Sequence, residues 1–332
     1  MRRSVIKRYV GYIAIGILII VACIYMRSSG PLKAQDETNC TYVSSRGILK
    51  SCDIYSSKPV SSTSTLDGYD FSKVVDGSIV YVASSAIPAF IERLASIPHK
   101  IVLVSGDADQ SVPDDAFKSS EEFRKFIEDD RIIHWFSQNS TKRHEKLTPI
   151  PIGLDYHSMA EKNHIWGSKM SPVGQEAELL RISGAAAPFY ERKPICYSNF
   201  HFNYKGSKFG SDRADAIREI PADLIYYEPK QVGRAATWKA MADYAFVASP
   251  AGNGLDCHRT WEALCLGCIA VVKTSPLDSL YMDLPVLIVE SWSDITQTKL
   301  ENTIREFRLK TFNYDRLLLS YWMDTIRGAA KA

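Results

Sequence analysis

Residues 246–272 contain two short apolar runs separated by a glycine-rich turn and a helix-like segment, and this arrangement strongly limits the fold of the chain. Phe246–Ala248 and Cys268–Val272 have the composition of buried strands, whereas Cys257–Leu266 has that of a helix. The turn that precedes the helix is rich in Gly, Pro and Asn. The region therefore predicts a strand–loop–helix–strand unit with its glycines at the helix entrance.

The start of this helix has the features of an anion-binding site. Free N–H groups and the helix dipole favour an anion there, and Gly252 and Gly254 allow a phosphate to approach the backbone closely. Arg259 lies one turn into the helix and can donate paired hydrogen bonds to a phosphate, and Glu262 follows three residues later. Such a site can hold a diphosphate and a ribose diol. The alternative is a tight turn beside a surface Arg–Glu pair.

A longer series of residues extends this pattern over positions 249–292. In chain order the series is Ser249, Pro250, Gly252, Gly254, Asp256, Arg259, Glu262, Ala263, Leu264, Gly267, Cys268, Ile269, Val271, Val272, Ser275, Pro276, Leu284, Pro285 and Trp292. It resembles the nucleotide-sugar motif of exostosin-family glycosyltransferases, and it departs from that motif at Ala270, where the family usually has proline.

The resemblance implies a GT-B architecture, in which two Rossmann-like halves face each other across a cleft. It also implies transfer of a sugar from a nucleoside-diphosphate sugar to a glycan or glycoprotein acceptor. A UDP-sugar is the favoured donor, with GDP-fucose left open. The donor is a substrate, and the resemblance requires no cofactor.

Donor-binding residues are expected in the C-terminal half. Glu262 would bind the ribose, while Arg259 and the 252–256 loop would bind the diphosphate. Basic residues on neighbouring loops can also contact the phosphates. The expected donor site consists of Gly252, Asn253, Gly254, Asp256, Arg259, Glu262, Arg213 and Lys273. Asn199, Asn203, Lys205 and Arg234 are further polar residues near it.

A general base is expected near the end of the proline-containing run Pro149–His157. Glycosyl transfer with inversion needs a base that takes the proton of the acceptor hydroxyl, and Asp155 or His157 can supply one. Two alternatives are left open: Asp155 caps a turn with His157 on the surface, or the reaction proceeds with retention and needs no dedicated base. Trp135, in the strand before this run, is expected in the core rather than in a sugar site.

Asp107 and Asp109 support a different hypothesis. They follow an apolar strand and resemble the metal-binding D-x-D of GT-A glycosyltransferases, where carboxylates hold Mn²⁺ or Mg²⁺ against a diphosphate. We favour a turn or cleft-edge role, because the donor motif lies in the other half. A further alternative is a non-catalytic protein that keeps the fold and binds a glycan or a partner.

The N-terminal segment predicts a membrane anchor. Residues 9–26 are almost wholly apolar and approach the roughly 20 residues that cross a bilayer as a helix. Residues 1–8 form a basic tail, so the positive-inside rule keeps this end in the cytosol. We expect a single-pass type II signal anchor in the lipid bilayer, in Golgi or endoplasmic reticulum membranes if the source is eukaryotic. A cleaved signal peptide is the alternative.

Charge argues against a nucleic-acid partner. The chain has 40 basic and 38 acidic residues, but five of the basic ones lie in residues 1–30, which hold no acidic residue. The remainder carries a net charge of −3 and has no basic aromatic stripe.

Cysteines and sequons bear on the compartment. Cys40 and Cys52 can close a small disulfide loop in an oxidising lumen, and this pairing is left open. The Cys and His residues within 257–268 lack a standard zinc-ligand spacing and are expected to be small buried side chains. Asn39 and Asn139 each begin a glycosylation sequon.

The rest of the chain predicts a stem and two halves. Residues 27–65 are rich in Ser, Thr and Lys without periodicity, as in a stem. Strand-like and helix-like runs then alternate through residues 66–175, the acceptor-side half, and 176–332, the donor-binding half, with a linker near 170–193. The expected fold class is α/β, with two Rossmann-like halves of GT-B type behind an N-terminal transmembrane helix.

Overall fold

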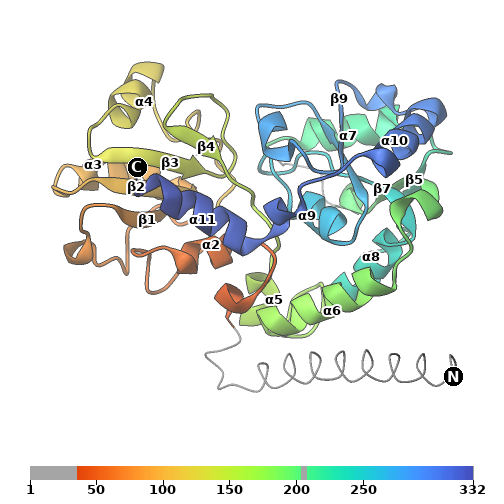
Figure 1. Ribbon diagram of the computed structural model, residues 1–332, viewed down its shortest axis with the longest axis horizontal. Helices are drawn as coiled ribbons and strands as arrows, with labels where there is room; N and C mark the ends of the chain where they lie inside the picture. The colour runs from red at the N-terminus through yellow and green to blue at the C-terminus, as the bar shows by residue number, and fades with distance from the viewer. Residues whose placement is uncertain (1–35, 203–207, 332) are drawn as a thin grey trace, which may run out of the picture.

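Two parallel β-sheets stand side by side in the computed structural model, which describes residues 36–202 and 208–331 (Figure 1). The first sheet has the strand order β1-β2-β3-β4, and the second has the order β6-β5-β7-β8-β9. Strands of the first sheet are β1 (Ser78–Ala83), β2 (Ile101–Gly106), β3 (Ile132–Ser137) and β4 (Leu147–Pro149). Those of the second are β5 (Lys193–Ser198), β6 (Ile225–Tyr227), β7 (Tyr244–Ala248), β8 (Ile269–Lys273) and β9 (Val286–Val289). The expected α/β class with parallel sheets is confirmed.

Helices connect most of these strands and cover the sheets. They are α2 (Ser45–Ser51), α3 (Ile87–Leu94), α4 (Ser120–Ile127), α5 (His157–Glu161), α6 (Pro172–Ala185), α7 (Gly210–Glu219), α8 (Arg234–Met241), α9 (His258–Cys265), α10 (Gln297–Leu309) and α11 (Leu319–Ala329). The unit expected around residues 246–272 is present as β7, α9 and β8.

The first sheet is buried on both faces because side chains alternate along each strand. Val80 packs in one cluster with Phe90 of α3. Tyr81, the next residue of β1, belongs to a second cluster that includes Ile48 of α2 and Trp322 of α11. Segments from near both ends of the described chain therefore cover one face of this sheet.

This packing differs from the expected boundaries in three places. Residues 36–65 were expected to belong to a stem, yet α2 lies within them and buries Ile48 and Leu49 against the first sheet. Helix α11 lies in the range assigned to the donor-binding half, but it packs on α2 and β3. In addition, α6 occupies much of the expected linker near 170–193. Apolar side chains from distant segments pack against the sheet, and local composition does not predict such long-range packing.

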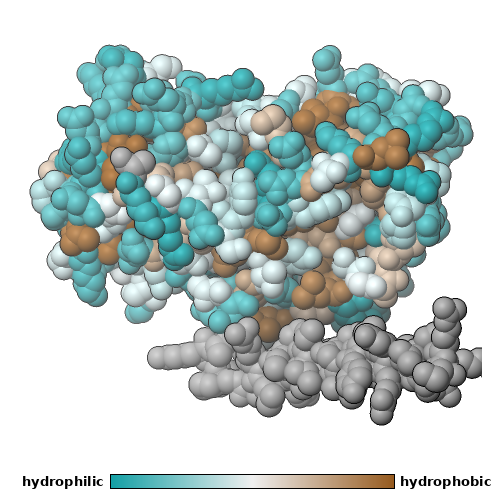
Figure 2. Space-filling model, viewed as in Figure 1, coloured by the Kyte–Doolittle hydropathy of each residue, from teal (hydrophilic) through white to brown (hydrophobic). Residues whose placement is uncertain are grey.

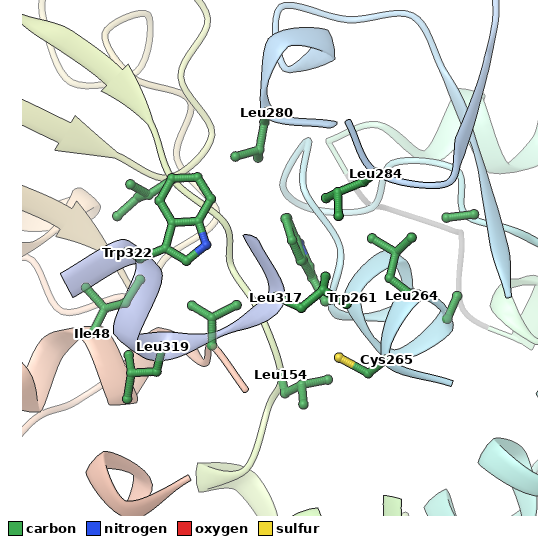
Figure 3. Packing of buried hydrophobic residues seen from close by; sticks show 14 of the residues in the cluster. Ile48, Leu154, Trp261, Leu264, Cys265, Leu280, Leu284, Leu317, Leu319 and Trp322 are labelled. Atoms are coloured by element: carbon green, nitrogen blue, oxygen red, sulfur yellow. The ribbon is translucent and has the colours of Figure 1, made fainter. Parts of the chain in front are cut away.

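One apolar cluster joins the two halves. Figure 3 shows side chains of α2, α9 and α11 gathered together with Leu280 and Leu284 from the segment between β8 and β9. Trp261 of α9 is completely buried there. Burial of such large apolar surfaces at about 25 cal/mol per Å² is the main stabilising contribution to this junction.

Hydrophilic side chains cover most of the face in Figure 2, and apolar patches are more prominent over the C-terminal half.

The expected anchor at residues 9–26 lies outside the described residues. Across 36–202 and 208–331, none of the helices combines the length and the apolar character needed to span a membrane.

The structure shows whether the cysteines pair and whether the sequon asparagines are exposed. Cys40 and Cys52 are buried free thiols, so the disulfide left open above is not formed in this structure. Asn39 is exposed, whereas Asn139 is only 1% exposed and its amide is hydrogen-bonded. The folded chain therefore keeps Asn139 out of reach of a glycosylating enzyme.

Candidate functional site

A cavity of about 430 Å³ lies between the two sheets, a size typical of small-molecule sites. Its walls come from loops that follow strands of both sheets. Asn199 follows β5, Glu228 follows β6, and the 252–256 loop follows β7, while Asp109 and Ile152 follow β2 and β4. The carboxyl ends of both parallel sheets therefore contribute to one site.

Strand order explains why the cavity forms here. In the second sheet, β5 has β6 on one side and β7 on the other, so the chain changes direction across the sheet between β5 and β7. The loops that leave these two strands diverge, and such a switch point is where open α/β sheets bind ligands. Asn199 and the 252–256 loop occupy it.

The N-terminus of α9 opens onto this cavity. Its N-cap, Cys257, has extended backbone and makes no side-chain cap hydrogen bond. The first N–H groups of a helix have no intrahelical acceptor, so they are available to an anion. Helix α9 ends at Cys265, and Gly267, two residues later, has a φ of +74° that glycine readily adopts.

Two guanidinium groups lie beside this helix start. Arg213 of α7 lines the cavity, and its Nε donates to the carbonyl of Ala251 at 3.2 Å. A Cβ at Gly252 would collide with the Arg213 guanidinium. Glycine at this position therefore gives Arg213 the space to approach the loop.

Arg259 is held more tightly. Its Nε donates to Asn199 Oδ1 at 3.0 Å, and its Nη1 is buried with no hydrogen-bond partner within the described part of the chain. Burial lowers the pKa of Arg259, and the positive charge of Arg213 acts in the same direction. A buried cation next to another cation favours an anionic ligand.

Glu262 lies one turn further along α9 and also lines the cavity. Its Oε1 is 3.8 Å from Nε of Arg234. Arg234 itself is buried, donates to Gln175 Oε1 at 2.6 Å, and stacks on Trp166 with its guanidinium carbon 4.4 Å from the ring centroid. Arg234 is therefore fixed in place and positions Glu262, rather than being a mobile surface residue.

Asp256 does not have the expected position of a phosphate-loop side chain. It is buried, and its carboxylate accepts hydrogen bonds from the Ile152 N–H at 2.8 Å, Trp261 Nε1 and Tyr281 Oη. Burial raises its pKa to about 6, against the effect of these hydrogen bonds. Asp256 lines the main cavity, and its carboxylate joins the two halves through these hydrogen bonds.

The other expected donor residues are divided between two cavities. Gly252, Asn253, Gly254 and Arg213 line the main cavity. Lys273 lines a separate cavity of about 180 Å³ on the other side of the loop, so it is not brought together with them. Asn203 and Lys205 lie outside the described residues.

The expected bases Asp155 and His157 are not among the side chains that line the main cavity. Asp155 is buried, accepts from the Ser158 N–H at 3.0 Å, and lies 3.2 Å from Nδ1 of His157. Burial alone would raise the pKa of Asp155, but the charges of His258, His157 and Arg234 lower it below the ordinary value. A buried carboxylate with these partners is poorly placed to take a proton from a ligand in the cavity, so the lining of this cavity does not support the predicted base at Asp155 or His157.

Asp107 and Asp109 lie in different environments. Asp107 is buried, accepts from Ser61 Oγ at 2.8 Å, and pairs with Arg46 at 3.4 Å, while Asp109 lines the main cavity. Among the described residues, no cluster of three or more His, Cys, Asp and Glu side chains has the arrangement of a metal site.

Several cavity residues were not assigned to the site from the sequence, and His258 and Trp166 are among them. His258 is the first residue of α9, and its Nδ1 lies 2.7 Å from the carbonyl oxygen of Gly153. Its position directly before Arg259 was the available signal. Trp166 has no sequence signal, because its loop is far from the motif. Trp135, by contrast, is completely buried as expected.

Comparison of the sequence with protein-family models and with curated proteins finds no match.

Proposed function

We propose that this protein is a glycosyltransferase that moves a sugar from a nucleoside-diphosphate sugar, favouring a UDP-sugar, to a glycan or glycoprotein acceptor. One observation carries the proposal: Arg213, Arg259 and the uncapped N-terminus of α9 converge on one cavity, with Glu262 one turn further along the same helix. Each of these groups matches a part of a nucleoside diphosphate.

The charges suit the chemistry of glycosyl transfer. When the bond between the anomeric carbon and the β-phosphate breaks, negative charge develops on the departing diphosphate. Arg213, Arg259 and the α9 N–H groups supply hydrogen-bond donors and positive charge for that group. Glu262 offers carboxylate oxygens to the two ribose hydroxyls.

The resemblance of positions 249–292 to exostosin-family enzymes supports the same proposal, together with a GT-B arrangement of two Rossmann-like halves. The second sheet would then bind the donor, and the first sheet would provide the acceptor side, where Asp109 and Ile152 reach the cavity. Residues 9–26 would hold the enzyme in the bilayer as a type II anchor, in Golgi or endoplasmic reticulum membranes of a eukaryotic source.

Isothermal titration calorimetry of the purified full-length protein with UDP, GDP and CDP tests the proposal. We expect UDP to bind, and we expect Arg259→Gln and Glu262→Ala each to weaken that binding at least about tenfold, equal to about 1.4 kcal/mol. The matched controls are Arg218→Gln on the exposed face of α7 and Glu301→Ala on α10.

Equal losses in the controls and in the cavity variants would remove the site assignment. Failure of all three nucleotides to bind would overturn the transferase proposal and favour the non-catalytic, partner-binding alternative.

A further inference from the structure

His258 is the one imidazole that lines the main cavity among the described residues. It is the first residue of α9, so it lies between the uncapped helix start and Arg259. An acceptor hydroxyl must approach the anomeric carbon next to the diphosphate, and His258 is adjacent in sequence to the residue proposed to bind that diphosphate.

The hydrogen bond of His258 fixes its tautomer. Nδ1 lies 2.7 Å from the carbonyl oxygen of Gly153, and a carbonyl accepts but cannot donate, so Nδ1 carries the proton. In the neutral ring Nε2 therefore has a lone pair. Nε2 has no hydrogen-bond partner in the part of the chain that the structure describes.

Groups around the ring suit a base that becomes cationic during the reaction. On protonation, the ring would be stabilised by the Gly153 carbonyl and by the carboxylate of Asp155, which interacts electrostatically with His258. Asp155, expected from the sequence as a base, would thus act as a positioning residue.

We propose that His258 is the general base of the transfer reaction, which makes the reaction inverting; this inference rests on the proposed function. In one displacement, the acceptor oxygen forms a bond to the anomeric carbon while the bond from that carbon to the β-phosphate oxygen breaks. The acceptor proton moves to Nε2 of His258. The bonding electron pair leaves with the nucleoside diphosphate, beside Arg213 and Arg259.

Hydrolysis of UDP-sugars, with water as the acceptor, provides the test for an enzyme whose natural acceptor is not known. UDP release from UDP-glucose, UDP-galactose, UDP-xylose and UDP-N-acetylglucosamine is measured with the full-length protein at saturating donor. His258→Asn keeps a side-chain N–H near Gly153 but lacks the basic nitrogen. We expect it to lower the rate of UDP release about 10²- to 10⁴-fold, with UDP affinity within about twofold of wild type. His99→Asn is the matched control, because His99 is half-buried near the start of β2 and does not line the cavity.

The pH profile adds a readout that a structural role would not change. The wild-type rate should rise with pH, because a general base accepts a proton only in its unprotonated form, and His258→Asn should lose this dependence. The titratable groups that interact electrostatically with His258 are Asp155 and His157, from the loop before α5 and its start, and Asp256 from the loop before α9; the charged Arg259 is the next residue of α9. Asp256 has a pKa of about 6, so Asp256→Asn must retain the rise if His258 is its source.

The other outcomes separate this inference from the proposed function. UDP binding with an unchanged hydrolysis rate in His258→Asn, or a loss confined to His157→Asn, would overturn the assignment of His258 alone. Retention of the anomeric configuration in the first product, observed by proton NMR, would also overturn it, as would ¹⁵N shifts showing a proton on Nε2. No binding of UDP to the wild type would instead overturn the proposed function itself.

Discussion

Oδ1 of Asn139, in the loop after β3, accepts a hydrogen bond of 2.9 Å from the backbone N–H of Asp256, in the loop after β7. The Asp256 carboxylate in turn accepts from the backbone N–H of Ile152, after β4. Loops from different sheets are thereby joined beside the cavity. The position of the proposed diphosphate loop relative to the first sheet depends on these buried polar contacts, because buried hydrogen bonds are costly to leave unmade.

Replacement of Asn139 by alanine should destabilise the protein. The Asp256 N–H would lose its partner, and alanine is less suited than asparagine to the φ of +53° at this position. We expect the free energy of unfolding to fall by about 1–3 kcal/mol in chemical denaturation. Asn302→Ala, on the exposed surface of α10, should change it by less than about 0.5 kcal/mol. Similar values for the two variants would contradict a joining role for Asn139.

Gly254→Ala and Gly184→Ala should have opposite effects on stability. A Cβ at Gly254 would lie 2.8 Å from Nδ2 of Asn139, so the joined loops would have to move apart. A Cβ at Gly184, in α6, meets no atom within 4 Å. We expect a loss of about 1–2 kcal/mol for the first change, and a gain of up to about 1 kcal/mol for the second, because alanine favours the helix. Thermal unfolding of both variants checks the signs, and a stabilised Gly254→Ala would disprove the close packing.

Asp256 should make stability fall as pH rises. Its pKa is raised from 3.8 to about 6 in the folded state, so the folded protein holds a proton that the unfolded chain has already lost. The contribution is complete below about pH 4 and is lost as pH rises through 6. Two pKa units correspond to about 3 kcal/mol.

Asp256→Asn removes this titration and leaves every other group in place. The difference in the free energy of unfolding between wild type and Asp256→Asn should therefore change by up to about 3 kcal/mol between pH 4 and pH 7, with the wild type losing stability relative to the variant. Urea denaturation at several pH values gives this difference. A constant difference over that range would show that Asp256 is ionised throughout.

UDP affinity should survive EDTA. Arg213, Arg259 and the start of α9 provide the positive charge and the donors that a diphosphate needs, so we expect the dissociation constant to change less than about twofold. Calorimetry with and without the chelator measures this. Loss of binding that only Mn²⁺ restores would revive the hypothesis that Asp107 and Asp109 hold a metal ion.

Much of the fold could be predicted from local patterns. Strand β7 contains the expected run Phe246–Ala248, and β8 lies within one residue of the expected run Cys268–Val272, because buried parallel strands have continuous apolar runs. The strand–loop–helix–strand unit around α9 has the same origin. Its glycines, Arg259 and Glu262 lie close together in sequence, so a single local unit brings them to one cavity wall.

Long-range packing decided the rest. Composition alone predicted a stem for residues 36–65. In the structure α2 and α11 pack on one face of the first sheet, and local sequence does not indicate this long-range packing. The sequence position of Asp256 predicts that it binds the diphosphate. In the structure its carboxylate accepts a hydrogen bond from Ile152, 104 positions away, and so links the two halves. His258 reaches Gly153 over a similar separation.

The sequence by itself determined the α/β class and the strand–loop–helix–strand unit that contains α9, because both depend on residues that are neighbours in the chain. Only the tertiary structure decided which side chains reach the cavity: His258 lines it, whereas Asp155 and His157 do not. The physical reason is that a side chain's exposure, its hydrogen-bond partners and the charges around it are set by segments that meet only when the two sheets pack together.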